Sequence, residues 1–134
     1  MISKLDDVFQ FQQQALGLRT YRQQLLASNI ANADTPGYKA RDINFSAALQ
    51  SALENGTQGA GLSKTSAQHI GGSPTQPVPG QQVVYRTPTQ PSVDGNTVEM
   101  DAERAQFAEN SIHIEASLTF INSQIKTLLA AVQS

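Results

Sequence analysis

The chain has 134 residues, enough for at most one ordinary domain, and 39% of them are hydrophobic. A formal net charge of −2 offers no basic surface for phosphate groups, so nucleic acid is not an expected partner. Cysteine is absent, which excludes disulfides, thiolate metal ligands and cysteine nucleophiles.

The beginning of the chain differs from a secretory signal. Asp6 and Asp7 lie where such a signal needs basic residues and then an unbroken apolar run. No stretch approaches the roughly 18 apolar residues that a spanning helix requires. The sequence therefore predicts neither a cleavable signal nor insertion into a membrane.

Residues 2–33 carry apolar side chains at helical spacing, with Gly17 as the only local weakness. The apolar positions form two neighbouring stripes, so the apolar arc is wider than one partner helix can cover. We expect a long helix that contacts several neighbours, including other subunits. The residues of this helix expected at a subunit interface are Phe11, Leu18, Leu25, Asn29, Ile30 and Asn32.

This helix is expected to end near Ala33. Pro36 lacks a backbone donor and disfavours helical angles at the residue before it, while Gly37 suits the positive φ of a type II turn. Asn29 and Asn32 share one face of the last turn, where their amides can cap free carbonyls, fix the turn or bond a neighbouring chain. The turn motif consists of Asp34, Thr35, Pro36, Gly37 and Tyr38.

The middle of the chain changes character twice. Residues 38–45 favour a short extended or irregular piece, and residues 46–53 have weak helical character. Residues 54–90 are rich in Gly, Ser, Thr, Gln and Pro, which predicts a low-complexity insert with one short strand at 82–86. Such an insert is either a contact surface in an assembly or a surface linker, and the sequence leaves both open.

Helical periodicity resumes after a turn at residues 91–96, and we expect the second long helix to begin between Asn96 and Asp101. Apolar residues then alternate at spacings of four and three, the period of a left-handed coiled coil. We call these positions the C-terminal seam: Phe107, Ser111, Ile114, Leu118, Ile121, Ile125, Leu128 and Val132. All of them except the polar Ser111 are expected at a subunit interface.

Residues that could carry chemistry are few. His69 lies in the insert, and His113 is better placed to pair with Glu109 on a helix surface than to bind a metal. Asp6 and Asp7 point about 100° apart on a helix and cannot flank one bond as acid and base. We therefore expect no enzyme activity, no metal and no cofactor.

Two motifs resemble the flagellar rod and hook family. Residues 28–38 read Ser-Asn-Ile-Ala-Asn-Ala-Asp-Thr-Pro-Gly-Tyr, similar to the N-terminal motif of that family. Residues 94–101 read Asp-Gly-Asn-Thr-Val-Glu-Met-Asp and resemble the segment that opens the C-terminal helix of rod proteins, particularly those of the proximal rod. The resemblance covers both ends of the chain and is uninformative mainly between residues 54 and 80.

The resemblance implies a structural subunit of the bacterial flagellar basal body. Such a subunit would assemble with copies of itself and other rod proteins into a shaft that crosses the periplasm, transmits torque and surrounds the export channel. Components of the MS ring or the export gate would adjoin its base. It would leave the cell interior through the flagellar export apparatus without a cleavable signal.

The expected fold is mainly α, with two long terminal helices packed as an antiparallel, coiled-coil-like hairpin and an irregular, partly β insert. Residues 1–35 and 97–134 would form one discontinuous helical domain, with residues 36–96 as the irregular central segment. A soluble helical hairpin that binds a partner helix, for example as an export adaptor, is the alternative. An interfacial membrane helix is less favoured, because neither long helix has a basic polar face.

Overall fold

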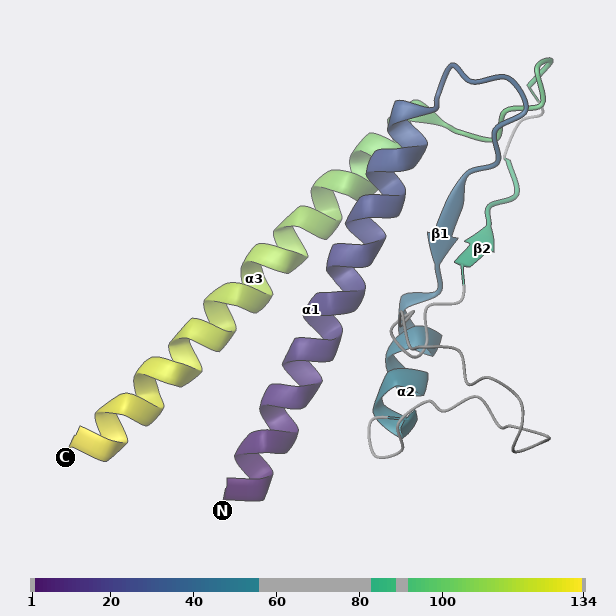
Figure 1. The fold of residues 1–134 in the computed structure, drawn as a ribbon. Helices are drawn as coiled ribbons and strands as arrows, with labels where there is room; N and C mark the ends of the chain where they lie inside the picture. Colours follow the sequence, from purple (N-terminus) through teal and green to yellow (C-terminus); the bar gives the residue numbers. More distant parts are fainter. Residues whose placement is uncertain (1, 56–82, 89–91, 134) are drawn as a thin grey trace, which may run out of the picture.

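The computed structural model describes residues 2–55, 83–88 and 92–133. In chain order the elements are helix α1 (Ile2–Ala31), strand β1 (Arg41–Ile43), helix α2 (Phe45–Asn55), strand β2 (Val83–Tyr85) and helix α3 (Met100–Gln133). The predicted mainly helical hairpin is confirmed: α1 and α3 run antiparallel beside each other, with both chain ends at the same end of the molecule (Figure 1). Residues 56–82 of the predicted insert, including His69, lie outside the described residues.

Strands β1 and β2 form a two-stranded antiparallel sheet in which Asp42 lies opposite Val84. The strand expected at residues 82–86 is present, although it spans only Val83–Tyr85. The sheet and α2 lie on one side of α1, while α3 lies on the other (Figure 1). Helix α1 is therefore the central element of the described fold.

The helix ends lie close to the predicted positions. Helix α3 begins at Met100, within the expected range. Helix α1 ends at Ala31, just before the predicted Ala33. The amide of Asn32 contacts the carbonyls of both Ser28 and Asn29, and the amide of Ala33 bonds the carbonyl of Ile30 at 3.3 Å. Such bonds to the third residue back tighten a final turn and end the α-helix.

The buried apolar core lies between α1 and α2 with β1. Leu18 and Leu25 of α1 pack with Ile43, Ala48 and Ala52, all of them buried. Because Ala48 and Ala52 of α2 are small, the two helices can approach closely. Partly buried side chains pack against the margin of this cluster. These marginal side chains are Tyr21, Phe45 and Leu49.

The contact between α1 and α3 has a different character. Within α3 the buried residues are Glu103 and Asn110, both polar and both near the turn end of the hairpin. Toward the free ends the helices draw apart (Figure 1), and a cavity of about 290 Å³ lies between them, with Val8, Phe9, Gln124 and Leu128 in its wall. The C-terminal seam is thus only partly covered by α1.

No helix among the described residues is long and apolar enough to cross a membrane.

Candidate assembly site

The turn motif after α1 adopts the conformation that its sequence predicts. The Tyr38 amide donates to the Thr35 carbonyl at 3.3 Å, and Gly37 has a φ of +73°. Gly95, in the segment before α3, has the same φ, and a Cβ added to it would lie 3.9 Å from the Gly37 Cα. The Gly37 amide donates to the Asp94 carbonyl at 2.9 Å. The two motifs, far apart in sequence, therefore interlock at this end of the hairpin.

Asn96 caps the C-terminal end of α1 from a distant part of the chain. Its side-chain Nδ2 lies 3.1 Å from the Asn32 carbonyl, 2.7 Å from that of Ala33 and 2.9 Å from that of Thr35. Its Oδ1 accepts from the Val98 amide at 2.8 Å. Because the last carbonyls of a helix lack partners within the helix, this buried side chain satisfies groups that the turn alone would leave free.

Backbone and hydroxyl bonds extend the junction. The Thr97 amide donates to the Tyr38 carbonyl at 3.0 Å, and the Thr97 hydroxyl accepts from the Ala40 amide at 2.7 Å. The Lys39 ammonium donates to the Gly95 carbonyl at 2.7 Å. The turn motif and the segment that opens α3 are thus held by paired contacts along their length.

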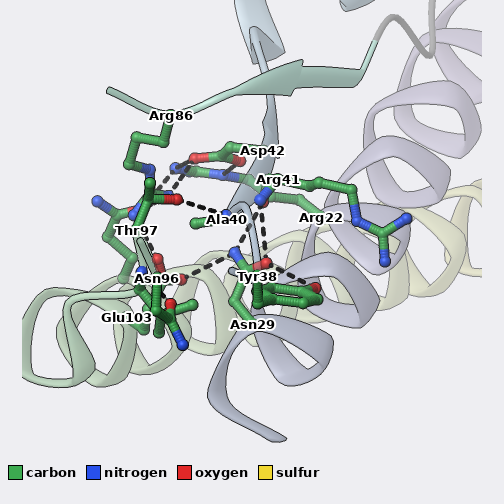
Figure 2. A network of polar contacts seen from close by, with 12 residues as sticks. Arg22, Asn29, Tyr38, Ala40, Arg41, Asp42, Arg86, Asn96, Thr97 and Glu103 are labelled. Carbon is green, nitrogen blue, oxygen red and sulfur yellow. Dashed lines mark hydrogen bonds and ion pairs between the residues drawn. The ribbon is translucent and has the colours of Figure 1, made fainter. Parts of the chain in front are cut away.

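Asn29 is fully buried, and both the nitrogen and the oxygen of its side-chain amide form hydrogen bonds within the chain (Figure 2). Its Nδ2 donates to the Arg41 carbonyl at 2.8 Å and to a Glu103 carboxylate oxygen at 3.2 Å. Its Oδ1 accepts from the Arg41 amide at 3.0 Å and from the Tyr38 hydroxyl at 3.3 Å. Asn29 therefore fixes the chain that follows the turn against both long helices.

Asn32 has a local role. Its Nδ2 donates to the Ser28 carbonyl at 2.8 Å, and its Oδ1 accepts from the Thr35 hydroxyl at 3.2 Å. These contacts cap the final turn of α1, one of the roles that the sequence left open.

An ionic network joins α1, the sheet and α3 (Figure 2). We call it the Asp42 network: Arg22, Asp42, Arg86, Glu103 and Gln106. Both guanidinium groups bond the Asp42 carboxylate, Arg22 at 2.9 Å and Arg86 at 2.7 Å. Arg86 also pairs with the fully buried Glu103 at 2.6 Å, and both arginines donate to the Gln106 side chain.

The Asp42 network shifts the ionisation of its members. Burial alone would raise the pKa of Asp42, but hydrogen bonds from Arg22, from the Ile43 amide and from Arg86 together outweigh burial and lower that pKa below its usual value. The hydrogen bond to Asp42 raises the pKa of Arg22. The charged forms of both residues are therefore favoured in the folded chain.

The expected interface residues fall into two groups. Leu18, Leu25 and Asn29 are buried by the chain itself, so their contacts are intramolecular and the interface prediction rests on the others. Apolar spacing on a helix identifies a face but not the neighbour that covers it. The residues that keep accessible surface are Phe11, Ile30, Asn32, Phe107, Ile114, Leu118, Ile121, Ile125, Leu128 and Val132.

Sequence reasoning missed most of the Asp42 network. Arg22 gave one signal, because it is a charged residue on an apolar stripe of α1. Asp42, Arg86 and Glu103 gave none, since their pairing depends on segments brought together only by the fold.

The predicted pair of His113 and Glu109 is present on the surface of α3, with 3.8 Å between nitrogen and oxygen. In the described ranges there is no group of three or more acidic, His or Cys residues that could hold a metal.

The class of protein follows from this geometry and from comparisons. The chain is a mainly helical protein whose two long helices are joined at one end by interlocked turns, and residues 9–39 match the family described as flagella basal body rod protein. It is 51% identical over 136 residues to the flagellar basal body rod protein FlgB of Proteus mirabilis, with 99% of this chain and 98% of that protein covered. FlgB of Escherichia coli K12 is 50% identical over 137 residues, with 100% and 99% covered.

The chain therefore belongs to the FlgB family of flagellar basal body rod proteins. It is a structural subunit of the rod of the bacterial flagellar basal body.

Proposed function

We propose that this subunit builds the proximal rod by packing its terminal helices against copies of itself and other rod proteins. The resulting helical shaft transmits torque and surrounds the export channel, and the role of the chain is structural rather than catalytic. Residues 1–35 and 97–134 act as one helical domain, with residues 36–96 as the connecting segment. The MS ring or the export gate adjoins the base of the shaft, and the rod crosses the periplasm after export of its subunits.

The observation that carries this proposal is the apolar surface of α3. Leu118 and Ile125 of the C-terminal seam are 45% and 42% exposed. Away from the seam, Ile112, Phe120 and Leu129 are more exposed still. On α1, Val8 and Phe11 add apolar area toward the same free end. Exposed large apolar side chains of this kind are typical of a protein interface, and helices of neighbouring subunits would cover them.

A charge on the C-terminal seam tests the proposal. We expect Leu118→Asp or Ile125→Asp to abolish incorporation into the rod, because an aspartate buried in an apolar interface costs several kcal/mol unless it is paired. The measurement is the amount of the chain in purified basal bodies, beside swimming motility. Thr119→Asp, at an exposed polar position next to Leu118, is the matched control and is expected to assemble.

Normal rods from both seam variants would contradict the proposal. A stable wild-type monomer that binds one partner helix with fixed stoichiometry would favour the export-adaptor alternative instead.

A further inference from the structure

The most deeply buried positions of α3 are polar. Glu103 is 0% exposed and Asn110 is 1% exposed, whereas the apolar C-terminal seam beside them retains accessible surface. The two residues lie one heptad apart, so they occupy the same face of the helix. Both of their side chains bond α1, which makes them the points at which the two long helices are joined by buried polar contacts.

Asn110 contacts both the backbone and a side chain of α1. Its Nδ2 lies 2.9 Å from the Arg19 carbonyl and 2.6 Å from the Gln23 side-chain oxygen. The Gln23 amide donates in turn to the Ser111 hydroxyl at 2.7 Å. The Asn110 Oδ1 is buried without a hydrogen-bond partner. An unsatisfied buried acceptor costs stability, which offsets part of what the two contacts of the Nδ2 contribute.

Glu103 makes the second connection. One carboxylate oxygen accepts from Asn29 of α1 at 3.2 Å, and the other pairs with Arg86 at 2.6 Å. A buried ion pair is rarely more stabilising than apolar residues of the same volume. In helical pairs, however, buried polar groups select one register, because a shift leaves them without partners.

We infer that Glu103 and Asn110 are positioning residues that, in addition to the interlocked turns, hold α1 and α3 in a single register. The apolar residues of the C-terminal seam repeat every heptad, so they discriminate poorly between the observed register and one shifted by seven residues. The polar contacts discriminate strongly, since a shift would separate Asn29 from Glu103 and Gln23 from Asn110 and Ser111. This inference concerns the hairpin of the single chain and stands whether or not the proposed assembly surface is correct.

Cysteine pairs introduced into the full-length chain test the register, because the natural sequence has no cysteine. Val8→Cys with Gln124→Cys reports the observed register, since both residues line the same cavity. Val8→Cys with Ser117→Cys, and Val8→Cys with Ala131→Cys, report shifts of one heptad in either direction. The yield with a thiol-reactive cross-linker long enough to span the cavity is measured for each pair, with helicity followed by circular dichroism.

In the otherwise natural chain we expect the Val8 and Gln124 positions to cross-link predominantly. Asn110→Leu, or Glu103→Met together with Arg86→Met, should retain helicity. Each should raise the yield of the cross-links that report a shifted register about tenfold, relative to the cross-link of the observed register. This factor corresponds to roughly one lost buried hydrogen bond. Asn110→Gln keeps an amide and should largely restore the original pattern. Thr119→Leu adds the same apolar bulk at an exposed position of α3 and should change nothing.

An unchanged cross-linking pattern in both apolar variants would overturn the inference, because the register would then be set elsewhere. Loss of all three cross-links together with helicity would overturn it as well. That result would mean that Asn110 and Glu103 hold the helices together rather than choose their register.

Discussion

Asp42 lies where α1, the sheet and α3 meet, and its carboxylate binds one arginine from each side. Arg22 reaches it from α1, and Arg86 reaches it from the chain just after β2. The Asp42 side chain is 13% exposed, so solvent screens these contacts less than it would screen a surface pair. A single carboxylate thus ties three segments together.

Asp42→Asn should lower the free energy of unfolding at pH 7 by about 2 kcal/mol, because hydrogen bonds to a charged group are lost. The folded-state pKa of Asp42 lies below its unfolded value. Its contribution is therefore present above about pH 4 and is lost as pH falls through the folded pKa. Urea unfolding at pH 7 and again near pH 3 measures the difference between variant and natural chain.

Glu115→Gln makes the same change from carboxylate to amide at an exposed position of α3 and should cost less than about 0.5 kcal/mol. A difference for Asp42→Asn that is equally large at pH 3 would rule out the ionic explanation.

Asn96→Ala should destabilise the chain by about 2 kcal/mol, since it frees carbonyls at the end of α1 and the Val98 amide at once. Thermal or urea unfolding provides the measurement. Asn122→Ala, at an exposed position of α3, is the matched control and should be nearly neutral. Equal effects of the two substitutions would show that Asn96 is not needed as a cap.

At the scale of elements, glycine has different effects in the turn after α1 and inside α1 itself. Gly37 has a positive φ, which is unfavourable for any side chain with a Cβ. Gly17 lies inside α1, where a Cβ would meet no atom within 4 Å. The same substitution should therefore have opposite effects at these two positions.

We expect Gly37→Ala to destabilise the chain by about 1 kcal/mol through backbone strain. Gly17→Ala should stabilise it by about 0.5–1 kcal/mol, because alanine favours the helix and restricts the unfolded chain. Denaturant midpoints of both variants, measured side by side, test the signs. A stabilising Gly37→Ala would contradict the strained turn.

At the scale of the whole molecule, the two sides of α1 differ in how well they are packed. On one side, Leu18 and Leu25 are enclosed by α2 and β1. On the other side, α3 leaves large apolar residues exposed toward its free end. Helices with unpaired apolar faces gain much of their stability from packing, so the outer parts of α1 and α3 should depend on neighbouring subunits.

Circular dichroism of the dilute chain, compared with the concentrated chain or a mixture with other rod proteins, tests this dependence. We expect helicity to be partial when the chain is dilute and to rise on association, because neighbouring subunits supply the contacts that the outer parts of α1 and α3 lack. Full helicity with cooperative melting in a dilute monomer would show instead that the hairpin is complete on its own.

The sequence by itself determined the two long helices, the turn that follows the first of them and the strand near residue 84. These follow from local rules: apolar periodicity, the missing donor of Pro36 and the positive φ available to Gly37. It also carried the two motifs that identify the family. Each of these signals lies within a short stretch, where neighbouring residues decide the backbone conformation.

Tertiary structure alone decided which groups meet. The sequence did not predict that Asn96 would cap α1, that Asp42 would bind two arginines, or that Glu103 and Asn110 would be the buried residues of α3. It also assigned Leu18 and Leu25 to an interface, whereas α2 and β1 cover them here. Long-range pairing depends on how segments far apart in the chain are brought together, and helical periodicity identifies a face without specifying its neighbour.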